Sequence, residues 1–116
     1  MRLIGLDDNY NQTLITVWSL IHLLVSSILY IVLCFFFSNS LSVILTIIIH
    51  TIYEFKDYYY SYILKYYNNS LFNSIGDTLA SLIGILLCLL FNIKLFVFIL
   101  LYIITMIIIL VFKLKS

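Results

Sequence analysis

The sequence predicts an all-α membrane protein, a four-helix transmembrane bundle with both termini in the cytoplasm. Of its 116 residues, 65% are hydrophobic and only 9% are charged, whereas soluble domains carry about 25% charged residues. The apolar residues form long continuous runs, without the alternation that barrel strands need. A chain this apolar requires lipid as its solvent, and helices satisfy their backbone hydrogen bonds within one segment there.

Each predicted element follows from one of these runs. About 20 apolar residues cross a bilayer as a helix, so the length allows four crossings within one domain. Short polar segments such as Ser38-Asn39-Ser40 and Asn68-Asn69-Ser70 form the predicted connections. The predicted spans are about 14–37, 41–60, 72–91 and 95–112, with a polar tail (1–13) before them and a basic tail (113–116) after them.

Basic residues set the predicted orientation. Four crossings place the N-terminal tail, the middle loop and the C-terminal tail on one side. That side carries Arg2, Lys56, Lys65, Lys113 and Lys115, and the other carries Lys94. Cytoplasmic loops are enriched in Lys and Arg, so both termini are predicted to be cytoplasmic. The net charge of +1 provides no basic surface for nucleic acid.

Ionisable side chains within the predicted spans are the strongest functional signal. They are His22 in the first span, His50 and Glu54 in the second, and Asp77 in the third. Such groups are costly in lipid and usually face the interior of a bundle. At 1.5 Å per residue, all four lie within ~15 Å of the predicted cytoplasmic ends of their spans. The four side chains are therefore predicted to lie in the cytoplasmic half of the membrane.

Residue spacing also places the polar side chains on common helix faces. His50, Glu54 and Asp57 are separated by four and three residues, and Asn73 precedes Asp77 by four. Side chains spaced in this way lie on one face of a helix.

A second stripe on the third span consists of small residues, Gly76, Ala80 and Gly84. Small residues spaced by four allow another helix to approach closely. This stripe predicts tight helix packing beside the polar face.

The polar residues leave several kinds of chemistry open. Imidazole and carboxylate groups suit a divalent metal, a carboxylate beside a histidine suits a general base, and a chain of such groups suits a proton or ion relay. The candidate ligand or metal-binding residues are His22, His50, Glu54, Asp57, Asn73 and Asp77. A fourth alternative is structural, with polar residues that only hydrogen-bond between helices.

Three stretches together resemble the YjdF-type inner-membrane proteins and, more loosely, the VanZ-like membrane proteins. They are Trp18-Ser19-Leu20-Ile21-His22, then Tyr53-Glu54 with Asp57, and finally Asn73-Ser74-Ile75-Gly76-Asp77 with Leu82-Ile83-Gly84. The resemblance covers about residues 14–91. It implies a small helical bundle and groups His22, Glu54, Asp57, Asp77 and Gly84 as one set. VanZ-type proteins are associated with resistance to glycopeptide antibiotics of the teicoplanin kind.

The sequence thus predicts a small multi-pass membrane protein with a polar pocket on the cytoplasmic side. The expected ligand is a lipid head group or a related amphiphile, and a divalent metal is one way to hold it. A structural or interaction protein and an enzyme acting on a lipid-linked phosphate are the alternatives. The catalytic residues, the oligomeric state and the identity of the membrane stay open.

The topology makes a testable prediction. The sequons Asn11-Gln12-Thr13 and Asn68-Asn69-Ser70 lie on the predicted cytoplasmic side, where glycosylation does not occur. Neither asparagine should carry a glycan when the chain is inserted into microsomal membranes, as judged by a glycosidase-sensitive mobility shift. A glycan at either site would contradict the orientation.

Overall fold

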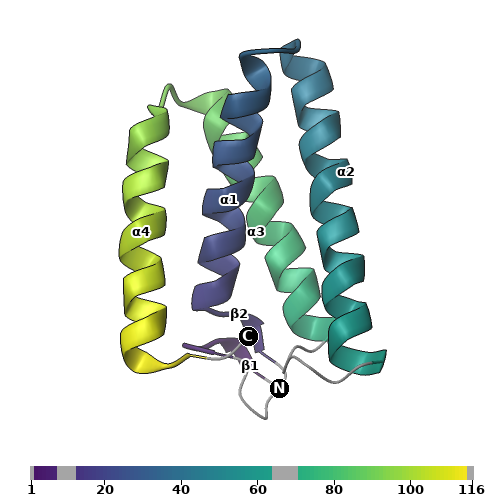
Figure 1. Ribbon diagram of the computed structural model, residues 1–116, viewed down its shortest axis with the longest axis vertical. Coiled ribbons are helices and arrows are strands. Elements are labelled where there is room, and N and C mark those ends of the chain that lie inside the picture. Colours follow the sequence, from purple (N-terminus) through teal and green to yellow (C-terminus); the bar gives the residue numbers. More distant parts are fainter. Residues whose placement is uncertain (1, 8–12, 64–70, 115–116) are drawn as a thin grey trace.

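The computed structural model describes residues 2–7, 13–63 and 71–114, and this part of the chain forms a bundle of four helices. Consecutive helices run in opposite directions, and the described chain begins and ends at the same end of the bundle (Figure 1). The helices are α1 (Val17–Cys34), α2 (Asn39–Tyr58), α3 (Leu71–Leu90) and α4 (Leu95–Phe112). A π-helical turn, η1 (Tyr59–Ile63), continues α2. The predicted helical bundle is therefore confirmed.

Three of these helices, α1, α3 and α4, are long and apolar enough to cross a membrane. The helix α2 is 20 residues long but does not qualify on composition, because its last turns contain Glu54, Lys56 and Asp57. The described chain therefore has four helices, of which three qualify as membrane-spanning by length and hydropathy.

The central element is α1, which contacts each of the other three helices. In Figure 1, α4 lies on one side of α1, α2 lies on the other, and α3 crosses behind it. Ile21, Leu24 and Tyr30 of α1 form the centre of the apolar core, with Ile85 of α3 and Phe98 of α4 also buried. Most other large apolar side chains point outward, as expected for helices solvated by lipid.

Two short strands precede α1, and they correct the predicted start of the first span. The strand β1 (Arg2–Ile4) pairs in parallel with β2 (Thr13–Ile15), and α1 begins only at Val17. Thr16 caps the helix, since its hydroxyl accepts from the backbone N–H of Trp18 and Ser19 Oγ accepts from the N–H of Thr16. Short apolar runs fit a strand as well as a helix end, so the sequence alone placed the helix start too early.

Several features of the sequence lie outside the described residues. They are Asn11, Lys65, Lys115 and the predicted loop at 68–70.

The small residues of α3 lie against α1 and β2. A Cβ added at Gly84 would lie 2.6 Å from the Leu23 carbonyl oxygen and 2.7 Å from Ser27 Oγ. A Cβ at Gly76 would collide with the carbonyl oxygen of Leu14. Both glycines are therefore positions where another part of the backbone approaches α3 too closely for a side chain.

Replacing Gly84 by leucine should separate α3 from α1. Overpacking a well-packed site costs about 1–3 kcal/mol or more, and contact with a backbone carbonyl leaves little room to adjust. We expect Gly84→Leu to lose the folded bundle in thermal unfolding measured in detergent. The matched control is Thr78→Leu, at an exposed position of the same helix. Equal melting temperatures for the two variants would contradict the close approach.

Candidate functional site

Five polar side chains from three helices converge within the otherwise apolar bundle. We call this group the polar cluster, and it consists of Ser19 and His22 from α1, His50 and Glu54 from α2, and Asp77 from α3. His22 and Asp77 lie near the beginnings of their helices, at the end of the bundle where the described chain begins and ends. The structure thus brings together four of the ionisable residues that the sequence selected.

The polar face of α2 explains how two members of the polar cluster point inward. Ser42 and Thr46 are fully buried, and His50 and Glu54 follow at the same four-residue spacing. This spacing keeps the four side chains on one stripe. The side of α2 that faces α1 and α3 is therefore polar along three turns of helix.

Asp77 is the most deeply buried charged group of the polar cluster, with a side chain that is only 3% exposed. Its Oδ1 accepts a hydrogen bond of 2.8 Å from Ser19 Oγ, and its Oδ2 lies 3.3 Å from His22 Nε2. A buried carboxylate is stable only when it is paired and hydrogen-bonded. Ser19 and His22 supply those partners from α1.

The other ring nitrogen of His22 faces α2. His22 Nδ1 lies 3.3 Å from His50 Nε2 and 3.5 Å from Glu54 Oε1, and His50 Nε2 lies 3.3 Å from Glu54 Oε1. The side chains of these three residues are 10–13% exposed. Both Glu54 oxygens are buried, yet neither accepts a hydrogen bond from the described residues.

Asp57 and Lys56 form a pair near the end of α2. Lys56 Nζ lies 3.9 Å from Asp57 Oδ1 and 4.2 Å from the centre of the Tyr53 ring. The Tyr53 ring is in turn 6.0 Å from the His22 ring, centre to centre. Asp57 therefore stands beside the polar cluster, paired with a lysine, and is not one of the ligand atoms that converge.

Asn73, the remaining ligand candidate, is directed elsewhere. Its side-chain nitrogen donates to the carbonyl oxygen of Thr13 at 3.0 Å and lies 3.5 Å from Thr16 Oγ1. It therefore joins α3 to β2 and to the start of α1. The sequence reasoning missed Thr16, although the Thr16-x-x-Ser19 spacing resembles that of a capping box.

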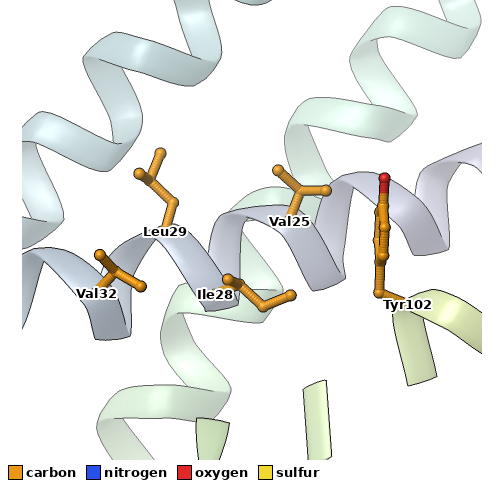
Figure 2. Close-up of a pocket in the computed structure, with 5 residues that line it drawn as sticks. All are labelled: Val25, Ile28, Leu29, Val32 and Tyr102. Carbon is orange, nitrogen blue, oxygen red and sulfur yellow. The ribbon is translucent and has the colours of Figure 1, made fainter. Parts of the chain in front are cut away.

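A groove of about 370 Å³ lies between α1 and α4 and shares no residue with the polar cluster. Figure 2 shows Val25, Ile28, Leu29 and Val32 of α1 beside Tyr102 of α4. Its lining surface is apolar, and Tyr102 is the one residue of the five lining it that carries a polar side-chain atom. The chemistry of the described chain is concentrated in the polar cluster.

No family model, curated protein or solved structure matches this chain. The resemblance to YjdF-type and VanZ-like proteins therefore stays a prediction.

The role of Ser19 can be tested directly. Ser19→Ala removes the donor to Asp77 and the acceptor for the Thr16 N–H. Removing one hydrogen bond to a buried charged group costs about 1.5–3 kcal/mol, so the free energy of unfolding in detergent should fall by an amount of that size. Thr51→Ala is the control, because its exposed hydroxyl donates to the Ile47 carbonyl of its own helix. Similar losses of stability in Ser19→Ala and Thr51→Ala would argue against the Ser19–Asp77 contact.

Proposed function

We propose that this chain is a multi-pass integral membrane protein that crosses the membrane four times, with both termini in the cytoplasm. In this proposal the polar cluster is a binding site on the cytoplasmic side for the polar head group of a lipid or a related amphiphile. Kinship with YjdF-type and VanZ-like proteins is part of the same proposal.

The two-sided character of α2 supports the fourth crossing. Its inward stripe is polar, while Ile44, Ile48, Ile52 and Phe55 on the other side are each about half exposed or more. A helix that buries its polar stripe within a bundle presents an apolar surface to lipid, although its mean hydropathy is low. This explains how α2 can cross a membrane together with α1, α3 and α4.

The single observation that carries the binding proposal is the gradual exposure of the polar side chains. Asp77 is 3% exposed, His22 and Glu54 are 12% and 13% exposed, and Lys56 is 42% exposed. The Tyr53 ring lies between Lys56 and His22, since Lys56 Nζ is 4.2 Å from its centre and the His22 ring is 6.0 Å from it. A head group at the membrane interface would meet Lys56 and Tyr53 first and the polar cluster next.

The structural alternative, in which the polar residues only join helices, is favoured by the contacts of Asp77 and Asn73. Ser19 donates to Asp77 and Asn73 donates to Thr13, so both contacts connect α3 to the N-terminal part of the chain. The contacts of Glu54 are different, because neither of its buried oxygens accepts a hydrogen bond from the described residues. Glu54 is therefore the residue that separates the two functions.

Glu54→Gln keeps the side-chain volume and removes the charge. We expect the bundle to fold with a stability change below about 1 kcal/mol, since interhelical hydrogen bonds in membranes average ~0.6 kcal/mol. We also expect the amphiphile retained by the wild-type protein to be lost, because a neutral amide is a poor partner for a cationic group or for a metal ion that holds the head group. Native mass spectrometry of protein released from its membrane measures this loss. The control variant, Lys94→Gln, removes a charge at the opposite end of the bundle and should retain the amphiphile.

Two results would contradict the binding proposal. One is a wild-type protein that retains no lipid or other amphiphile. The other is a Glu54→Gln variant that retains as much as the wild type. Either would leave the structural alternative in place.

A further inference from the structure

We infer that His22 Nδ1, His50 Nε2 and Glu54 Oε1 form a three-ligand site for one divalent transition-metal ion of the zinc type. The inference rests on the proposed function, because it names the chemistry by which the polar cluster would hold an anionic head group. The ion would be bound by three protein atoms, and its remaining position would accept a phosphate, carboxylate or water oxygen.

The three ligand atoms lie at the corners of a nearly equilateral triangle. Its edges are 3.3 Å between the two imidazole nitrogens, and 3.3 and 3.5 Å from these nitrogens to the Glu54 oxygen. Metal–ligand bonds of about 2.0–2.1 Å in a tetrahedral zinc site separate neighbouring ligand atoms by about 3.3–3.4 Å. Adjacent ligands of an octahedral ion with similar bonds would be only about 3.0 Å apart. The edges therefore match the spacing of ligand atoms around a tetrahedral ion.

A network of hydrogen bonds explains the same geometry less well. Charge-assisted hydrogen bonds of the N–H···O⁻ type are about 2.7–2.9 Å long, and the two contacts of Glu54 Oε1 are longer than that. One hydrogen bond between the imidazoles fits the distance of 3.3 Å. That bond still leaves the buried carboxylate oxygens of Glu54 without a donor among the described residues. A cation bound at the triangle would satisfy Oε1 directly.

Asp77 is placed to orient His22, one of the three proposed metal ligands. Ligating histidines almost always direct their second ring nitrogen to a carboxylate, a carbonyl or water, and this contact fixes the tautomer. Here Asp77 Oδ2 lies 3.3 Å from His22 Nε2, which favours a proton on Nε2 and a lone pair on Nδ1. The Ser19 hydroxyl holds the other oxygen of Asp77. Nδ1, at one corner of the triangle, then carries the lone pair that a metal ligand needs.

Charge balance also favours a divalent ion. With neutral imidazoles, the ionised carboxylates of Glu54 and Asp77 give the polar cluster a formal charge of −2. Buried charges require compensation, and one divalent cation cancels this charge. Lys56 Nζ lies 3.9 Å from Asp57 Oδ1, so this lysine already compensates another carboxylate.

Binding of Co²⁺ alone tests the site, because a tetrahedral cobalt centre has strong visible absorption that an octahedral one lacks. Wild-type protein in detergent, stripped with a chelator, should bind one equivalent of Co²⁺ with a tetrahedral spectrum. Zn²⁺ should then displace the cobalt. His50→Gln and Glu54→Gln should each lose the spectrum. Asp77→Asn should keep the stoichiometry and weaken binding by about 10–100-fold, as expected for a supporting carboxylate.

Controls address folding and other ligands. Thermal unfolding of each variant shows whether the loss of metal reflects loss of the bundle, and Glu54→Gln is the least disruptive of the ligand changes. Cys34→Ser and Cys88→Ser should keep full cobalt binding, because neither thiol belongs to the triangle. Loss of the spectrum in either cysteine variant would assign the metal to a thiolate site and overturn the inference.

The outcomes separate the metal site from the proposed function. A wild-type protein that shows no tetrahedral cobalt spectrum, or a folded Glu54→Gln variant that binds cobalt like the wild type, overturns the metal site. If chelated wild-type protein still retains its amphiphile, the binding function stands without the ion. If metal binds with the expected dependence on His50 and Glu54 but no amphiphile is retained, the metal site stands and the head-group proposal fails.

Discussion

The carboxylate of Asp77 is the group on which the arrangement of the bundle depends. A charge buried among apolar helices is stable only if neighbouring helices supply its partners. Ser19 donates to one oxygen and His22 lies beside the other, both from α1. These contacts require α1 and α3 to lie close together, and Gly84 makes that approach possible beside Leu23 and Ser27. The close packing of α1 against α3 and the burial of the Asp77 carboxylate therefore depend on each other.

Much of the fold was predictable because helical periodicity is visible in a sequence. The spacing of His50 and Glu54 placed both on one face of a helix, and the structure has them 3.3 Å apart there. Counting residues from the ends of the apolar runs also placed His22 and Asp77 at one depth. Neither inference needs a partner residue to be known, since the period of a helix and its rise per residue are fixed.

The features that the sequence did not predict depend on contacts between segments that are separated along the chain. The strands β1 and β2 pair because residues 2–4 and 13–15 come together, and no pattern in either triplet specifies the other. Asn73 shares a helix face with Asp77 but donates to β2, because the strand pair occupies the space beside it. Spacing identifies a face, whereas contacts across the molecule depend on the tertiary structure.

The distribution of the polar cluster over the helices has a mechanical consequence. His50 and Glu54 belong to one helix and move as a rigid unit, whereas His22 belongs to another. Sliding or tilting of α2 against α1 would change the two distances that start at His22 Nδ1, whereas it would leave the four-residue spacing of His50 and Glu54 on α2 unchanged. The shape of the triangle therefore depends on the position of α2 relative to α1. A group bound across the triangle would lock the relative position of α1 and α2, and its departure would release them.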